Sequence, residues 1–354
     1  MKPPAQESVY AASSSPSVRS KAPYEESSQA AFDDWLRDQH AQMTTPSDLV
    51  AQYVRKAAHS PLVSSKRLIV GRDNEVYKVT TADGRALIVR VSHRDDPRFE
   101  AERWALDAVR AQGVPTPQVL LVEKAALTDH FVTFCIEEKM PGRPLDVLLK
   151  SGSKQPARTI AEIGAMLGRI HRVPVKGFGY LRPDGPDGNG WDIPFSAIMV
   201  DLLDKEAELA QAATRWSVPE ESVTQGLALL AANTNLYQWN APCLTHGDFG
   251  AAHILVDEEQ ITGVIDFQEC SGNHPVFDFA HWYVHWEDEI PLSQLIASYQ
   301  DSAGVLDERF EPLLHLALLR ECLWMLMVRI RQNNPYDIQA FKKGIDKGLA
   351  FFSG

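Results

Sequence analysis

The order of apolar and polar positions predicts a strand-rich first part of the chain. Residues 67–81, RLIVGRDNEVYKVTT, hold two apolar runs that are separated by the turn-forming tetrapeptide GRDN. The run ALIVRVS at 86–92 indicates a buried strand, and 97–112 indicates a helix closed by glycine and proline. The segment 118–142 then predicts two more strands that end at a Pro-Gly break. We expect an antiparallel sheet with one inserted helix over roughly 62–138.

Helical periodicity dominates after this break. The segment 157–173, ARTIAEIGAMLGRIHRV, is strongly amphipathic, and helices are expected to about Trp239 and again from Val276 to Phe352. Turns and short strands over 243–268 interrupt the helices. The pattern therefore predicts an α+β, two-lobed fold with an antiparallel sheet plus a helix in the first lobe and a mainly helical second lobe.

The N-terminal region predicts a tail followed by helices. Residues 1–30 are rich in Ser, Pro, Ala and Gln and lack periodicity, so we expect a disordered tail. Two short helices follow, the second with Ser47 as a natural N-cap. We divide the rest of the chain into a first lobe with these leading helices at 31–140 and a helical second lobe at 141–354.

Charge and composition restrict the classes of molecule that the protein is expected to bind. The chain of 354 residues has 35 Lys and Arg against 47 Asp and Glu, a formal charge of −12. This balance argues against nucleic-acid and anionic-membrane binding and suits a cationic small molecule. The four cysteines form no CxxC pair, and neither a membrane-length apolar stretch nor a secretory signal is present. We expect free thiols and a cytoplasmic protein.

The densest chemical signal lies in the interrupted region. The run LTHGDFGAAHILV at 244–256 is followed by ITGVIDF at 261–267. Transfer of a phosphoryl group needs an alcohol held in line, a carboxylate to accept its proton and metal ions that neutralise phosphate charge. Asp248 would be the catalytic base, and His253 and Asp266, five and eighteen residues later, would hold the metal.

The pattern HGDxxxxHIL…VIDF resembles the aminoglycoside phosphotransferase family, whose members have a protein-kinase-like fold. The resemblance implies that Asp248 orients and deprotonates the acceptor hydroxyl and that His253 and Asp266 bind Mg²⁺. Most members have Asn in place of His253, whereas members similar to macrolide phosphotransferases have His. Because Mg²⁺ prefers oxygen ligands, a water-mediated contact or tolerance for manganese stays open. His246 is expected to fix the loop.

The first lobe would bind the nucleotide. Arg90 stands where kinases place the phosphate-gripping cation, and Glu102 resembles its helical partner, with Glu100 as the competing choice. Asn74 belongs to a turn that resembles the phosphate-covering loop, although a bare hairpin turn looks the same. By resemblance, the Glu138 carbonyl and the Met140 amide would contact the purine, which leaves ATP versus GTP open.

The acceptor is the least determined part. The acidic run Glu287–Glu289 favours a polycationic sugar, if it borders the site. The segment Gly177–Tyr180 and the Gly/Pro-rich loop after it are similar to hygromycin-type phosphotransferases, whereas His253 indicates macrolide-type members. His171 and the aromatic run that contains His281 are interpreted as core packing, and Asp278 as a residue that fixes the catalytic loop.

We therefore expect an ATP- or GTP-dependent phosphotransferase that needs Mg²⁺ and phosphorylates a hydroxyl of a small molecule, favoured to be an aminoglycoside or macrolide antibiotic. A metabolic kinase that acts on homoserine, choline or a sugar is the alternative, and a non-catalytic kinase-like binding module is a third hypothesis. A protein kinase is disfavoured because the His-Arg-Asp and Ala-Pro-Glu motifs are missing. Monomer and homodimer both stay open.

Overall fold

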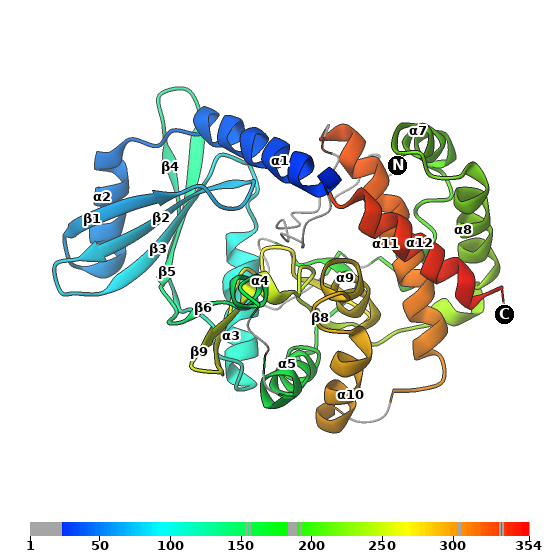
Figure 1. The fold of residues 1–354 in the computed structure, drawn as a ribbon. Coiled ribbons are helices and arrows are strands. Elements are labelled where there is room, and N and C mark those ends of the chain that lie inside the picture. The colour runs from blue at the N-terminus through cyan, green and yellow to red at the C-terminus, as the bar shows by residue number, and fades with distance from the viewer. Residues whose placement is uncertain are drawn as a thin grey trace, which may run out of the picture.

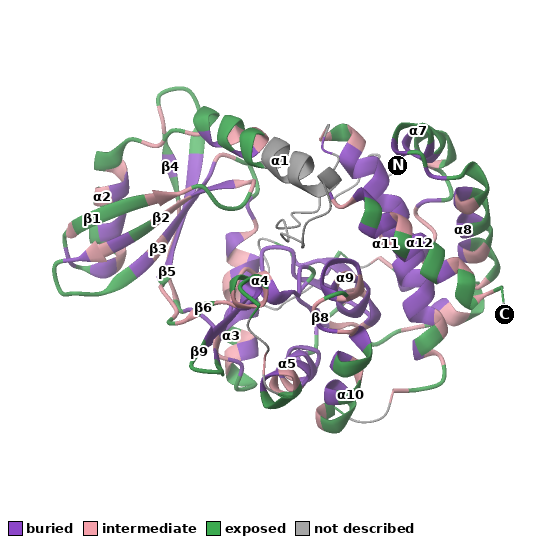
Figure 2. Ribbon diagram, viewed as in Figure 1, coloured by how far each residue is buried: buried purple, intermediate pink, exposed green. Residues whose placement is uncertain are grey.

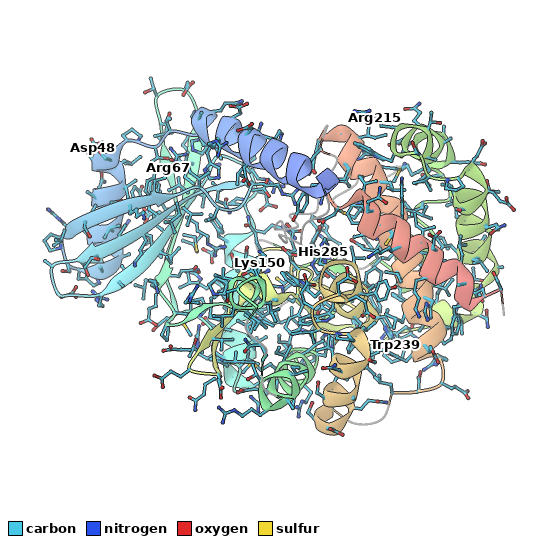
Figure 3. All side chains as sticks on the ribbon, in the orientation of Figure 1. Asp48, Arg67, Lys150, Arg215, Trp239 and His285 are labelled. Atoms are coloured by element: carbon cyan, nitrogen blue, oxygen red, sulfur yellow. The ribbon has the colours of Figure 1, made fainter. Side chains whose placement is uncertain are left out.

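The computed structural model describes residues 23–152, 155, 157–182, 190–191, 193–303, 306–332, 334 and 336–353. It has two lobes, with a sheet-based lobe at one end and a helical lobe at the other (Figure 1). Arg67 in the sheet and His285 in the helical lobe mark the two parts in Figure 3.

The first lobe is built on a five-stranded antiparallel sheet with strand order β1-β2-β3-β5-β4. One face of the sheet packs against α2, where the rings of Tyr53 and Phe134 stack with centroids 4.3 Å apart. Ser47 is the first residue of α2 and not its N-cap, because the chain enters this helix through Pro46 without a side-chain cap. The elements are α2 (Ser47–Ala58), β1 (Leu62–Leu68), β2 (Asn74–Thr81), β3 (Ala86–Ser92), α3 (Phe99–Ala111), β4 (Val119–Ala126) and β5 (Phe131–Glu138).

Helix α1 (Pro23–Gln42) precedes this lobe and extends from the side of the helical lobe to the sheet (Figure 1). It begins within the segment that we expected to be a disordered tail, and residues 1–22 lie outside the described residues. Arg67 of β1 donates hydrogen bonds to the carbonyl oxygens of His40 and Met43, at 2.7 and 2.8 Å. Leu36 packs on Tyr336 of the second lobe, so α1 contacts both lobes.

The second lobe surrounds α11, a helix of 22 residues that is buried along most of its length (Figure 2). Two three-stranded sheets, β10-β9-β6 and β7-β11-β8, lie between this helical core and the first lobe. The strands are β6 (Arg143–Pro144), β7 (Gly179–Tyr180), β8 (Cys243–Thr245), β9 (Ile254–Asp257), β10 (Gln260–Val264) and β11 (Ser271–Asn273). The helices are α4 (Leu145–Lys150), α5 (Ala157–Ile170), α6 (Phe195–Met199), α7 (Glu206–Trp216), α8 (Glu220–Ala232), η1 (Thr234–Tyr237), η2 (Ala251–His253), α9 (Val276–Trp286), α10 (Leu292–Ala303), α11 (Phe310–Arg331) and α12 (Ile338–Phe351).

The predicted α+β, two-lobed arrangement is confirmed, with an antiparallel sheet plus α3 in the first lobe and a mainly helical second lobe. The predicted strand segment of the second lobe extends further than expected, because β11 follows it. All four cysteines are free thiols. None of the helices in the described ranges is long and apolar enough to cross a bilayer.

Candidate active site

The loop after β8 is held in place by one buried carboxylate. Asp278, near the start of α9, accepts hydrogen bonds from the backbone N–H groups of His246 and Gly247, both at 2.9 Å. His171 Nε2 lies 3.0 Å from the same carboxylate. Gly247 has φ +80°, and a Cβ there would collide with the backbone oxygen of Glu269. Asp278 and His171 thus form a hydrogen-bonded support that fixes the loop.

Asp248 follows this support and is buried. His281 Nε2 on α9 lies 2.9 Å from Asp248 Oδ1, and His253 Nδ1 lies 3.8 Å from Asp248 Oδ2. Burial alone would raise the pKa of Asp248, but His253 and His281 hold it well below its usual range. The structure therefore presents Asp248 as an anion. The interpretation of His281 as core packing is incomplete, because this side chain contacts the carboxylate directly.

His253 and Asp266 face each other. His253 Nδ1 donates to the backbone carbonyl of Asp248 at 2.8 Å, and His253 Nε2 lies 3.6 Å from Asp266 Oδ2. Because Nδ1 carries the donated proton, Nε2 of a neutral ring has a lone pair that faces the Asp266 carboxylate. A lone pair and an anion repel each other, so for a neutral ring this arrangement is favourable only with a cation between them. Burial lowers the pKa of His253, but the carboxylates of Asp248 and Asp266 outweigh it and raise that pKa.

This donor pair fits a divalent cation. It offers one carboxylate oxygen and one imidazole nitrogen, and a magnesium or manganese ion would complete its shell with phosphate and water oxygens. Asp266 has a left-handed backbone, φ +66°, at the turn after β10 that turns its side chain towards His253. In the described part of the chain no set of three or more His, Cys, Asp or Glu side chains is arranged to hold a metal.

Arg90 of β3 joins the two lobes. Its guanidinium lies 2.6 Å from Glu102 of α3, 3.2 Å from Glu137 of β5 and 3.5 Å from Asp266 of the second lobe. These carboxylates raise the pKa of Arg90 against the effect of burial, and burial raises the pKa of Glu102 to about 7 although Arg90 opposes it. Glu100 instead pairs with Arg103 on the outer face of α3. Glu137, which the sequence did not single out, is a third member of this cluster.

Asn74 lies at the border between the lobes. It is the first residue of β2, and its Nδ2 donates to Gln268 Oε1 at 2.9 Å. Gln268 in turn donates to the Pro97 carbonyl at 2.8 Å. These bonds connect the start of β2 to the segment that follows Asp266.

The connection after β5 contains Glu138 and Met140, the two residues that were expected to contact the purine. The Glu138 amide donates to the Gln118 carbonyl, and the Lys139 amide donates to the Ala86 carbonyl. Within the described ranges the Met140 amide has no backbone acceptor.

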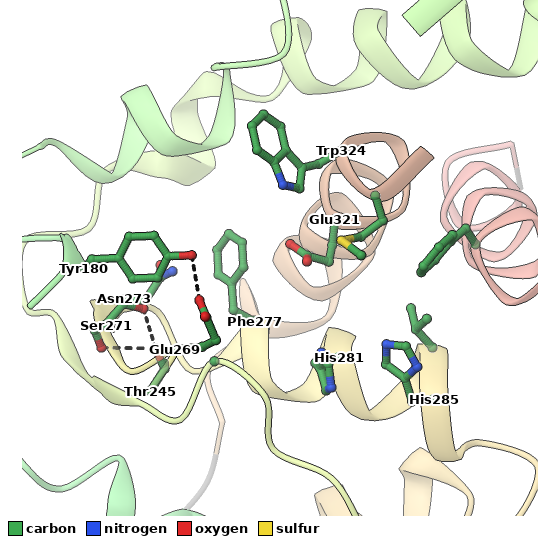
Figure 4. A pocket seen from close by; sticks show the side chains of 14 residues that line it. Tyr180, Thr245, Glu269, Ser271, Asn273, Phe277, His281, His285, Glu321 and Trp324 are labelled. Carbon is green, nitrogen blue, oxygen red and sulfur yellow. Dashed lines mark hydrogen bonds between the residues drawn. The ribbon is translucent and has the colours of Figure 1, made fainter. Parts of the chain in front are cut away.

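A cavity of about 60 Å³ opens beside the catalytic loop (Figure 4). His281 and His285 point into it from α9, and Glu321 and Trp324 from α11 (Figure 4). Such a volume holds a few water molecules or one substituent of a larger compound. It is lined by Tyr180, Thr245, Gly247, Glu269, Ser271, Asn273, Phe277, His281, Val284, His285, Glu321, Trp324, Met325 and Phe341.

The carboxylates of this cavity have cationic neighbours. Glu269 lies 2.7 Å from Arg98 and accepts a hydrogen bond from the Tyr180 hydroxyl at 2.9 Å. Glu321 lies 3.4 Å from Arg320, and burial raises the pKa of Glu321. No motif in the sequence pointed to either glutamate.

The acidic run Glu287–Glu289 bears on the acceptor only if it borders the site. None of its three residues is among those that line the cavity. Glu287 accepts a hydrogen bond from the Leu292 amide at 2.6 Å, and Asp288 lies 3.3 Å from Lys343. Part of the Gly/Pro-rich loop, residues 183–189 and 192, lies outside the described residues, whereas Tyr180 lines the cavity.

A comparison with protein-family models identifies one family. A family model described as "phosphotransferase enzyme family" matches residues 65–313. Hygromycin-B 4-O-kinase of Escherichia coli is 25% identical over 203 residues, which are 56% of this chain and 55% of that kinase. The chain thus spans about half the length of this curated relative.

Solved structures share the fold. A thermostable mutant of aminoglycoside phosphotransferase APH(4)-Ia, in a ternary complex with ADP and hygromycin B, has a TM-score of 0.67 and 20% identity, over 86% of this chain and 99% of that one. Macrolide 2'-phosphotransferase MphH from Brachybacterium faecium has a TM-score of 0.57 and 16% identity, over 84% and 98% of the two chains.

Proposed function

Because this chain belongs to the phosphotransferase enzyme family, we propose that it transfers the γ-phosphoryl group of ATP or GTP to a hydroxyl of a small molecule. One observation carries the proposal. A continuous series of contacts runs from Glu102 through Arg90, Asp266 and His253 to Asp248, and so connects the sheet-based lobe to the catalytic loop. Phosphoryl transfer needs these groups together, because it depends on positioning and on electrostatic stabilisation.

Each residue of this series has a separate task. Arg90, held by Glu102 and Glu137, binds the α- and β-phosphates, and the Met140 amide and the Glu138 carbonyl bind the purine. His253 and Asp266 hold the divalent cation, which when bound neutralises charge on the β- and γ-phosphates. Asp248, held by His281, orients the acceptor hydroxyl and receives its proton. Asn74 holds the start of β2 beside the phosphates.

The acceptor is proposed to be an antibiotic that enters beside Asp248. The hygromycin kinase relative supports an aminoglycoside, and the fold shared with MphH extends the choice to a macrolide. The cavity offers aromatic faces, among them Phe277 and Trp324, together with two glutamates that already have arginine neighbours. The free thiols suit a cytoplasmic enzyme.

A mass-based screen tests the proposal. The purified chain is incubated with Mg²⁺ and ATP or GTP against hygromycin B, other aminoglycosides, macrolides and a panel of hydroxylated metabolites. We expect an antibiotic to gain the mass of one phosphoryl group. A phosphoryl mass gain on a metabolite alone would indicate a metabolic kinase. If the protein bound nucleotide but no acceptor gained a phosphoryl group, the proposed activity would be contradicted for this panel.

A further inference from the structure

The side chain of Arg72, in the loop between β1 and β2, contacts the second lobe. Gly71, with φ +69°, turns the chain at this loop, and Arg72 follows it. Arg72 Nη1 donates to Gln332 Oε1 at 3.1 Å, although the two residues are 260 positions apart. Gln332 follows the last residue of α11. Arg72 thus bridges the two lobes from the turn that resembles the phosphate-covering loop.

A second cation uses the same acceptor. Arg329 Nη1 donates to Gln332 Oε1 at 2.9 Å, so one neutral amide oxygen accepts from two guanidinium groups. Arg329 is 1% exposed, and its Nε donates to the Tyr336 carbonyl. Burial lowers the pKa of Arg329 to about 9, and the charge of Arg72 contributes to this lowering. The Asp337 carboxylate, 3.9 Å from Arg329, offsets part of the repulsion between the two guanidinium groups. A phosphate oxygen that reached Arg72 would form a charge-assisted hydrogen bond, which is stronger than the bond to the neutral amide of Gln332.

The charge of the catalytic carboxylate acts on this guanidinium. Burial lowers the pKa of Arg72, and the carboxylates of Asp73, Asp248 and Glu269 oppose that effect. Asp248 and Glu269 belong to the catalytic loop and the cavity wall of the opposite lobe. The Arg72 side chain is thus within electrostatic range of the position where the acceptor hydroxyl must lie.

The backbone on both sides of Arg72 is held. The Gly71 carbonyl lies 2.9 Å from His40 Nε2 of α1, and Asn74 is bonded to Gln268. A side chain on an anchored loop can exchange one hydrogen-bond acceptor for another while the backbone stays in place. A guanidinium bond to a phosphate is shorter and stronger than one to a neutral amide, which favours the exchange when a nucleotide is present.

We propose that Arg72 is a catalytic residue that leaves Gln332 and binds the oxygens of the γ-phosphoryl group during transfer. The inference rests on the proposed phosphotransferase function. In the reaction, the bond between the γ-phosphorus and the β,γ-bridging oxygen breaks, and its electron pair leaves with the nucleoside diphosphate. The acceptor oxygen bonds to phosphorus, and its proton passes to Asp248. Arg72 neither gains nor loses a proton and supplies positive charge, as an arginine supplied within the same chain does in other phosphoryl transfers.

Nucleotide binding tests the inference without an acceptor. Calorimetry with Mg²⁺ would compare AMP-PNP and GMP-PNP with ADP and GDP for the wild type, Arg72→Met and Arg94→Met. Arg94 is a matched control, since it lies 3.7 Å from Asp73 at the edge of the same lobe. We expect Arg72→Met to lose about tenfold or more in affinity for the triphosphate analogues only, as for one charge-assisted hydrogen bond. Equal losses for diphosphates, or none, would overturn the inference.

A second variant separates phosphate binding from a structural bridge. Gln332→Leu removes the Gln332 acceptor of Arg72, and it should leave the affinity for the triphosphate analogues unchanged or higher. If Gln332→Leu lost as much affinity for the triphosphate analogues as Arg72→Met, the Arg72–Gln332 hydrogen bond would only stabilise the arrangement of the lobes. The inference would then be wrong. Absence of nucleotide binding by the wild type would instead contradict the proposed function itself.

Discussion

At the scale of single residues, Asp248 is the point on which the proposed chemistry depends. His281 from α9 and His253 from η2 hold it as an anion although it is buried. An ionised carboxylate can accept a hydrogen bond from an alcohol and orient its oxygen, which a protonated one cannot do in the same way. Both histidines therefore contribute to the state in which Asp248 meets the acceptor.

The first residue-scale prediction concerns the base. Asp248→Asn should lower the rate of phosphoryl transfer by about 10²- to 10⁴-fold, the usual contribution of a general base. Nucleotide affinity should be unchanged, because Arg90, His253 and Asp266 remain. Steady-state kinetics and calorimetry check the two parts, with Asp257→Asn, an exposed carboxylate at the end of β9, as the control. Wild-type turnover in Asp248→Asn would refute the assignment.

The second residue-scale prediction concerns His281 as a positioning residue. His281→Ala removes the bond to Asp248 Oδ1 and should lower kcat by about 10- to 100-fold, the value of one charge-assisted hydrogen bond. His281→Gln can place an N–H near the same position and should restore most of the loss, with little change in KM for the nucleotide. A purely structural role predicts that both variants lose thermal stability and activity together, which a melting curve would reveal.

At the scale of elements, close contact between helices orders the second lobe. Gly164 and Gly168 on α5 face α10, and a Cβ at Gly164 would lie 2.6 Å from the Tyr299 amide nitrogen. At Gly168 a Cβ would meet side-chain atoms of Ala303 and Ser302 at 3.0 Å. The first contact is short and includes backbone, which cannot move aside, whereas the second is longer and involves the Ala303 Cβ and a Ser302 hydroxyl that can rotate away. The pair therefore sets how near the two helices lie.

This difference predicts unequal effects of the same substitution. Gly164→Ala should lower the free energy of unfolding by about 1 to 3 kcal/mol, the usual cost of overpacking. Gly168→Ala should be nearly neutral, since the higher helix propensity of alanine, about 1 kcal/mol, offsets a milder clash. Urea denaturation of the two variants checks this order. A larger loss in Gly168→Ala than in Gly164→Ala would show that the helices do not meet as described.

At the scale of the whole molecule, stability should depend on pH through buried histidine. His274 is 5% exposed beside Phe195 and Trp239, and its Nδ1 accepts a hydrogen bond from the Val276 amide. Burial, followed by the charge of His171, lowers the pKa of His274 from 6.5 to about 3. The folded protein therefore keeps this ring neutral in a range where the unfolded chain takes up a proton.

The expected effect on stability comes from that difference in proton uptake. Below pH 6.5 the unfolded chain binds the proton and the folded chain does not, so His274 should reduce the free energy of unfolding by about 2 kcal/mol between pH 7 and pH 5. His274→Asn keeps an acceptor for Val276 and cannot titrate. Its denaturation curves should show a smaller loss over the same range. An equal loss in the variant and the wild type would contradict this origin.

Local sequence was sufficient for the fold class and for the candidate residues of the catalytic loop. The strands of the first lobe appear as apolar runs between turn residues, and Asp248, His253 and Asp266 lie within a short stretch around one hairpin, β9-β10. Such features depend on neighbours in the chain. The α+β fold and the family were predicted on this basis and are confirmed, whereas the roles of the individual site residues remain proposals.

Contacts between distant segments were decided only by the tertiary structure. Periodicity identifies a buried face but not its partner, so His281 was assigned to the core although it contacts Asp248, and Glu137 was not placed beside Arg90. The acidic run after α9 lies outside the described cavity wall for the same reason. The bridge from Arg72 to Gln332 joins the two lobes across most of the chain. The sequence by itself determined which chemical groups are present and how they are spaced along the chain. The packing of the lobes decided which of those groups meet, because long-range contacts depend on the whole fold and not on neighbouring residues.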